Sequence, residues 1–151
     1  MNEGAKFNAL VEDFGRAAGM TFECDADGLW RIPAHGGDVT ACLVYREASG
    51  QVIAFAPVEE LRPRRHAAER ARVLLEANAF WSGTNGFTLA LDPDARRLVA
   101  MDRRAPDYFS SVDRLAGYVN ALAELVVELR FNLRHFDEAD EIAEELAGTE
   151  G

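Results

Sequence analysis

The sequence predicts an α+β domain in which helices cover a mainly antiparallel sheet, in the order helix, three strands, helix, two strands and long helix. Short β-rich runs separated by turn motifs fill residues 20–58. A hairpin pattern, "FTLALDPDARRLVAM", occupies residues 87–101. Apolar residues recur with the spacing of a helical face in three further segments, 4–18, 66–80 and 112–136.

Composition and charge narrow the class of protein. Hydrophobic residues make up 48% of the chain and charged residues 28%, which is typical of a soluble globular protein. The net charge of −10 has the wrong sign for a nucleic-acid binder and favours a partner of basic character. No apolar run approaches the roughly 18 residues that a membrane span needs. Residues 1–20 lack the features of a secretory signal, so a cytoplasmic protein is expected.

The charge also divides the chain. We assign residues 1–136 to a single domain and residues 137–151 to an acidic C-terminal tail. Residues 137–150 hold seven of the 26 acidic residues and no Lys or Arg. The tail either extends the last helix or frays, and it is interpreted as a solvated end rather than a regulatory arm.

The first helix is predicted over residues 4–18, where Phe7, Leu10, Val11 and Phe14 share one face. Gly19 follows as a C-terminal stop. Turn motifs then separate three predicted strands of a meander, near residues 28–32, 39–47 and 51–58. Such a sheet exposes one face unless helices cover it.

The second helix is predicted over residues 66–80, after Pro63 in the loop "RPRR". Gly83 and Gly86 end it and begin the hairpin. One hairpin face carries Phe87, Leu89 and Leu91, and the other carries Thr88 and Ala90, with "DPDA" as a type I turn between the strands. A hairpin that is apolar on both faces is either buried between layers or offered to a partner.

The last helix has the clearest pattern. Its apolar residues follow one another in alternating steps of three and four, which predicts a straight seam over about 25 residues. The residues of the seam are Val112, Leu115, Val119, Leu122, Val126, Leu129, Leu133 and Phe136. Ser110, with Asp113 three residues later, resembles a helix cap.

No catalytic residue, metal site or cofactor is predicted. His35, His66 and His135 have no partner at the spacing of a zinc site. Asp25 and Asp27 resemble the start of a calcium loop that lacks its later ligands, so a plain turn is favoured. Two further sets are also interpreted structurally. Cys24 and Cys42 are read as buried thiols, and Arg62, Arg64 and Arg65 as a solvated loop rather than an anion patch.

One segment resembles a known family. "LLEANAFWSGTNGFTLALDPDARRLVAM", residues 74–101, is similar to the signature region of the class I type III secretion chaperones, the family that includes the chaperone of the translocated intimin receptor. The matching residues are Leu74, Leu75, Ala77, Asn78, Phe80, Trp81, Gly83, Gly86, Leu89, Leu91, Asp92 and Pro93. The first helix and the long last helix also fit, so the resemblance covers about residues 4–135.

The resemblance implies a bacterial homodimer without enzymatic activity or cofactor. Such a protein binds the N-terminal region of a secreted effector in extended form and keeps it competent for secretion. The effector-binding candidates implied by the resemblance are Phe7, Leu10, Leu89, Leu91 and Leu98. The dimer-interface candidates are Ala71, Leu74, Asn78, Phe80 and Trp81.

The chain departs from the family pattern at three places. Residues 20–38 are longer than the expected first strand, Leu129 stands where many members carry Trp, and the acidic tail extends the usual end. An alternative therefore stays open, a non-secretory regulatory or small-ligand-binding dimer on the same fold. A deep cavity with converging titratable groups would favour that alternative.

Overall fold

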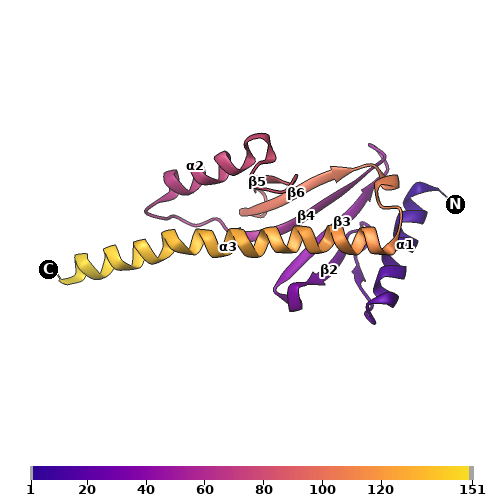
Figure 1. Ribbon diagram of the computed structural model, residues 1–151, viewed down its shortest axis with the longest axis horizontal. Coiled ribbons are helices and arrows are strands. Elements are labelled where there is room, and N and C mark those ends of the chain that lie inside the picture. Colours follow the sequence, from indigo (N-terminus) through magenta and orange to yellow (C-terminus); the bar gives the residue numbers. More distant parts are fainter. Residues whose placement is uncertain (1, 150–151) are drawn as a thin grey trace.

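A computed structural model describes residues 2–149, and of residues 139, 140, 143 and 149 it describes the backbone alone. A six-stranded antiparallel sheet, in the order β1-β2-β3-β4-β6-β5, lies against one long helix (Figure 1). The predicted α+β class and order of elements are confirmed. The elements are α1 (Glu3–Ala17), β1 (Glu23–Cys24), β2 (Trp30–Ala34), β3 (Val39–Arg46), β4 (Gln51–Glu60), α2 (Ala67–Asn78), β5 (Thr88–Asp92), β6 (Arg97–Arg104) and α3 (Val112–Thr149).

The region after α1 differs most from the prediction. β1 was not predicted, because two residues are too few for an alternating pattern to show. β2 begins at Trp30 rather than near residue 28, since the Asp25 side chain accepts backbone N–H bonds from Asp27 (2.9 Å) and Leu29 (3.0 Å) and holds the chain in a turn. The bond from Leu29 lowers the pKa of the Asp25 carboxyl. The predicted turn at Asp25 and Asp27 is confirmed.

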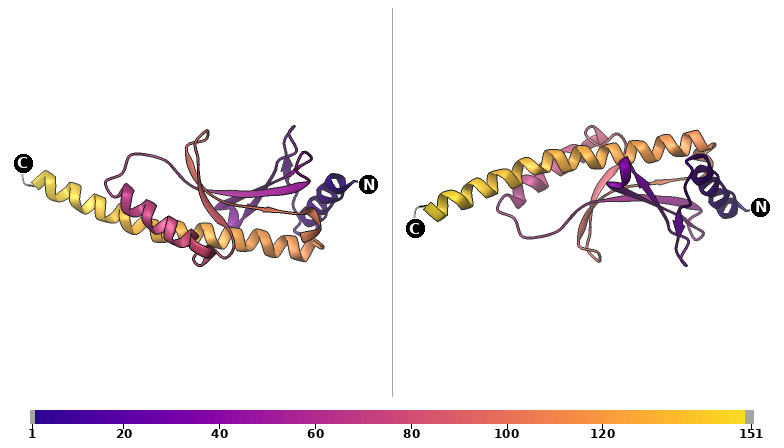
Figure 2. Two further views of the ribbon diagram at one scale, coloured as in Figure 1. Left: turned by 90° about the horizontal axis from the view of Figure 1, so that it is seen from above. Right: turned by 90° about the horizontal axis from the view of Figure 1, so that it is seen from below.

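The core lies between α3 and one face of the sheet (Figure 2). Leu115, Leu122 and Val126 of α3 are fully buried. They meet small residues of β4, Ala54 and Ala56, which allow the helix to approach the strands closely. The alternating seam predicted for this helix is thus its buried face.

α1 packs at one end of this layer. Phe7 of α1 lies against Phe109, with 5.8 Å between the ring centroids. The Trp30 indole N–H donates to the Asn8 side chain across 3.0 Å and ties β2 to α1. α1 therefore closes the end of the core near the start of α3 (Figure 1).

Ser111 caps the start of α3. The sequence had suggested Ser110 for this position. The Ser111 hydroxyl oxygen accepts the backbone N–H of Arg114 at 3.1 Å, three residues ahead, which is the geometry of an N-cap. At its other end α3 continues to Thr149 and projects past the sheet (Figure 1). The acidic tail therefore extends the helix over the described residues, and Glu150 lies outside them.

The two cysteines differ in exposure. Cys42 is buried in the middle of the sheet, as predicted. Cys24 is exposed, contrary to the prediction, because it lies on the two-residue edge strand β1. Burial raises the pKa of the Cys42 thiol, so it stays protonated at neutral pH.

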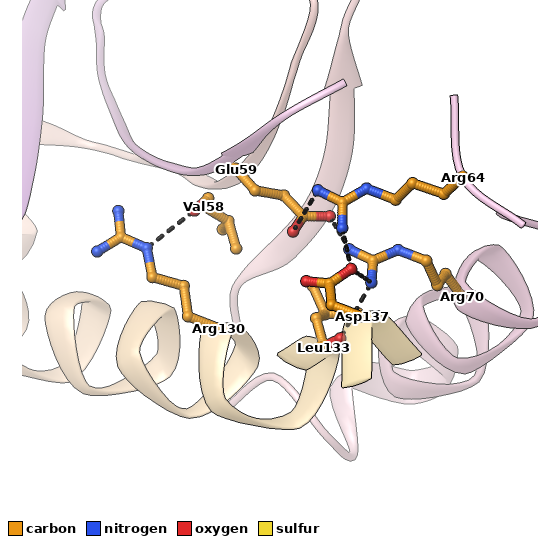
Figure 3. A network of polar contacts seen from close by, with 7 residues as sticks. All are labelled: Val58, Glu59, Arg64, Arg70, Arg130, Leu133 and Asp137. Atoms are coloured by element: carbon orange, nitrogen blue, oxygen red, sulfur yellow. Dashed lines mark hydrogen bonds and ion pairs between the residues drawn. The ribbon is translucent and has the colours of Figure 1, made fainter. Parts of the chain in front are cut away.

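A network of ion pairs between charged side chains joins α2 to the rest of the fold (Figure 3). Arg70 of α2 is 4% exposed; it pairs with Glu59 of β4 and with Asp137 of α3 (3.3 Å), and donates to the Leu133 carbonyl (3.0 Å). Arg64 pairs with the same two carboxylates. The prediction that Arg64 belongs to a solvated loop is wrong, whereas Arg62 and Arg65 are exposed.

A second arginine ties α3 to the sheet. The register of β4 against β6 shifts between Pro57 and Glu59, which turns backbone carbonyls out of the ladder. Arg130 donates to the carbonyls of Pro57 (3.1 Å), Val58 (2.8 Å) and Asp38 (2.8 Å). One guanidinium thus caps the irregular strand and the turn before β3.

Replacing Arg130 by Met is expected to lower the free energy of unfolding by about 2–3 kcal/mol, because three charge-assisted hydrogen bonds are lost and carbonyls are left with fewer partners. Urea denaturation of the purified variant measures the change. Arg130→Lys is expected to recover only part of the loss, since an ammonium group cannot span the three carbonyls as the planar guanidinium does. Equal stability of the Met variant and the wild type would show that these bonds contribute nothing.

Candidate functional site

The sheet has one uncovered face. α3 lies on the inner face, and no helix of the described residues lies over the opposite one, here called the outer face (Figure 2). The register pairs Phe55 with Met101 and Met101 with Thr88, so residues of β4, β6 and β5 form continuous rows on this face. Phe55 and Met101 are half-buried apolar side chains in these rows, and a partly exposed apolar surface of this kind is suited to binding another chain.

The outer face also has a depression. A cavity of about 750 Å³ is lined by Ile53 of β4, Met101 of β6, Thr88 of β5 and Trp81, together with Gly86 and the charged residues Asp102, Arg103 and Arg104. Cys42, Val44 and Val99 alternate with the residues of the inner core along their strands. Their side chains are buried on the outer face without joining the main core. The outer face is therefore hollowed and mostly apolar, with charged side chains at the β6 end of the hollow.

The structure separates the predicted effector-binding residues into two groups. Phe7, Leu89 and Leu98 are buried in the core of the described chain. Leu10 is half-buried and lines a cavity of about 310 Å³ between α1 and the segment before α3. Leu91, at the end of β5, is 62% exposed. Leu10 and Leu91 are thus the two of the five that present surface to a partner.

The predicted dimer-interface residues lie on α2 and in the turn that follows it. Ala71 is exposed, and Leu74 is half-buried against the core. Phe80 is 94% exposed and Trp81 57%, both with a positive φ of 54° to 56° that non-glycine residues rarely adopt. Exposed aromatic side chains held on a strained backbone make this turn a candidate interaction surface.

Asn78 has a role within its own chain. Its side-chain nitrogen donates to the Leu89 carbonyl (2.8 Å), and its side-chain oxygen accepts the Leu89 N–H (2.7 Å). The Asn78 amide therefore satisfies both backbone hydrogen-bonding groups of Leu89 on the free edge of β5. This pairing fixes α2 against the hairpin, and Trp81, three residues further on, lines the cavity of the outer face.

A polar cavity lies at the end of the sheet, between β6, α3 and the turn before β5. It measures about 380 Å³. Asp102 accepts from Arg104 Nε (2.8 Å) and from the Tyr118 hydroxyl (2.9 Å). The guanidinium carbons of Arg104 and Arg114 lie 4.7 and 4.4 Å from the centre of the Tyr108 ring. Several titratable groups therefore converge in this cavity, which is here called the arginine pocket.

Sequence reasoning missed the arginine pocket because its members come from separate segments, each ordinary by itself. Asp102 and Arg104 share a face of one strand, and this i, i+2 spacing was the one signal available. The outer face was foreseen only in part, through the hairpin that is apolar on both sides. Ile53 and Phe55 of β4 were not singled out.

Tyr118 is expected to make the protein less stable at alkaline pH. Burial raises the pKa of the Tyr118 phenol far above its usual value, and the neighbouring Asp102 carboxylate raises it further. The unfolded chain releases this proton near pH 10 and the folded chain does not, so the free energy of unfolding falls as pH rises above about 10, by up to about 1.4 kcal/mol per pH unit. Tyr118→Phe removes this contribution. It costs about 1 kcal/mol at pH 7 through the lost hydrogen bond.

Denaturation at pH 7 and pH 11 measures both effects. The difference between wild type and Tyr118→Phe is expected to shrink or reverse at pH 11. A difference that stays constant would show that the phenol ionises as freely in the folded protein as in the unfolded chain.

An uncovered apolar sheet face beside exposed aromatic side chains defines a protein that binds other polypeptides. The chain belongs to the Tir chaperone protein (CesT) family, whose model matches residues 9–130. It is therefore a chaperone of the type III secretion class, as the resemblance had implied. No curated protein sequence matches the chain. Within the described residues, no helix has the length and apolar character of a membrane span.

Solved structures share the fold at low identity. A chain of the HopA1-SchA chaperone-effector complex is 19% identical with a TM-score of 0.68, over 86% of this chain and 98% of that chain. A chain of the ExoU-SpcU complex from the type III secretion system of Pseudomonas aeruginosa is 21% identical with a TM-score of 0.60, over 80% and 94%. YbjN from E. coli, provisionally described as a transcription regulator, is 17% identical with a TM-score of 0.61, over 85% and 91%.

Proposed function

We propose that the protein is a cytoplasmic homodimeric chaperone that holds the N-terminal region of a type III secreted effector in extended form. The observation that carries the proposal is the outer face, an apolar and hollowed surface with no described helix over it. An extended segment lies on such a face by placing alternate side chains into it. Many small contacts offset the roughly 2–5 kcal/mol that ordering the segment costs. In this proposal the protein acts by binding its client and does not catalyse a reaction on it.

The dimer is assigned to α2 and the turn after it. Phe80 and Trp81, with Val73 and Leu75 of α2, give this end of the molecule several of its exposed apolar side chains. Burying them against a second copy removes them from water without covering the whole outer face. Leu10 and Leu91 stay candidates for client contact outside the outer face, and Phe7, Leu89 and Leu98 support the fold from the core.

The test is co-purification of the tagged chain from its native host, with the solution mass measured on the same sample. A dimer carrying the N-terminal region of one exported protein is expected. Met101→Asp places a charge on the outer face and is expected to release the client and leave the dimer intact. Phe80→Asp is expected to weaken the dimer instead. Ala48→Asp, in the exposed turn between β3 and β4, adds the same charge as a control.

A second candidate function is a regulatory protein that binds a small ligand in the arginine pocket. The convergence of Asp102, Arg104, Arg114 and two tyrosines in one cavity favours it. A clean dimer without any client, together with a small molecule retained through purification, would support this function and overturn the chaperone proposal. A monomer without a client would contradict both.

A further inference from the structure

We propose that the arginine pocket receives the carboxylate side chain of an Asp or Glu in the bound client segment. The proposal rests on the chaperone function above and deepens it, because it names a residue type that the client must carry. An apolar outer face alone selects for hydrophobic character and leaves the register of an extended segment free to slip. One charged contact at the end of the sheet fixes the register.

The charges of the pocket favour a singly charged anion. Arg104 donates from Nε to Asp102. Among the described residues, Asp102 is the one carboxylate that pairs with Arg104. Arg114 has no carboxylate within ion-pair distance among the described residues, and it is held only against the Tyr108 ring. Two guanidinium groups and one carboxylate leave a local charge of about +1 in a chain whose net charge is −10. This balance suits a carboxylate better than a doubly charged phosphate.

The walls of the pocket keep it open. Gly117 lies inside α3, where glycine is a poor helix former. A Cβ at Gly117 would meet no atom within 4 Å, so packing does not require a glycine there. The opposite wall is a tight turn from Thr84 to Phe87, closed by a 3.1 Å backbone hydrogen bond, with Asn85 and Gly86 at positive φ. A helix and a turn that both lack bulk at this point preserve the opening.

The pocket is continuous with the outer face. Gly86, Asp102 and Arg104 line both the arginine pocket and the larger cavity of the outer face. β5 begins at Thr88, which pairs with Met101, whereas β4 continues alongside β6 as far as Arg104. On the β5 side the last three residues of β6 therefore have no strand partner among the described residues. A segment on the outer face reaches the pocket through this gap at the end of β5.

The experiment uses displayed random peptides of 15 residues, selected on the full-length wild-type protein. The selected peptides are expected to share an Asp or Glu at one fixed distance from their apolar residues. One such peptide is then synthesised with Glu or Gln at that position. The Glu peptide is expected to bind the wild type about tenfold more tightly than the Gln peptide.

Variants of the arginine pocket test whether its residues cause the preference for the Glu peptide over the Gln peptide. Arg114→Met and Gly117→Leu, the second of which fills the pocket from α3, are expected to bind both peptides equally and about as tightly as the wild type binds the Gln peptide. Arg46→Met, an exposed arginine at the end of β3, is expected to keep the tenfold preference. Circular dichroism and the solution mass show which variants fold and associate normally, and Arg114→Met carries the test if Gly117→Leu does not fold.

The outcomes separate this inference from the proposed function. Selected peptides without a fixed acidic position, or a Glu preference that survives in Arg114→Met, would overturn the inference and leave the chaperone function standing. A small anion such as acetate that binds the pocket without competing with the Glu peptide would also overturn it. Failure of the library to yield any peptide, with no client co-purified, would overturn the chaperone function itself.

Discussion

Arg70→Met is expected to lower the free energy of unfolding by about 3 kcal/mol. The substitution keeps much of the buried stem but removes the charge that Glu59 and Asp137 share with Arg64. Removing one partner of a buried ion network commonly costs about 3–5 kcal/mol, and the lower end applies because both carboxylates keep some exposure to water. The Leu133 carbonyl also loses a donor.

The matched control is Arg72→Met, two residues further along α2. Arg72 pairs with Glu76 one helical turn away, and both side chains are mostly exposed, so the loss is expected to stay below about 0.5 kcal/mol. Chemical denaturation of both variants, followed by far-ultraviolet circular dichroism, measures the two losses. Equal losses at Arg70 and Arg72 would mean that the buried network does not stabilise the fold.

Leu122→Ala is expected to have the largest effect on the core, a loss of about 3–4 kcal/mol in the free energy of unfolding. Leu122 is fully buried in the first half of α3, where the helix crosses the sheet. A rigid layer of strands and small alanine side chains cannot collapse into the space that the substitution leaves, so most of the cavity persists.

Leu75→Ala makes the same chemical change on the exposed side of α2, where Leu75 is 68% exposed. It is expected to leave the stability of the single chain nearly unchanged and to weaken the dimer. Thermal unfolding at several protein concentrations separates the two effects, because only the dimer makes the midpoint depend on concentration. A concentration-independent midpoint for the wild type would contradict the dimer assignment.

The regular parts of the fold could be predicted from the sequence. The steps of three and four in α3 are a local signal with one physical cause, burial of a single helical face. The hairpin of β5 and β6 was equally predictable, since Asp92 accepts the backbone N–H groups of Asp94 and Ala95 and holds the turn in place.

Two features could not be predicted in this way. Arg70 lies on the inward side of α2, where an apolar residue would be expected, and its partners stand 11 and 67 residues away in the chain. The arginine pocket likewise gathers Asp102, Arg114 and Tyr118 through the packing of β6 on α3. Such sites depend on long-range contacts, for which a single sequence carries no periodic signal.

The position of α3 in the chain has a consequence for synthesis on the ribosome. All six strands precede the one helix that covers their inner face. While the strands leave the ribosome, both faces of the sheet and its edges are bare, and chains in that state associate readily. The nascent protein therefore depends on the prompt arrival of its own last helix, as its client depends on the completed chaperone.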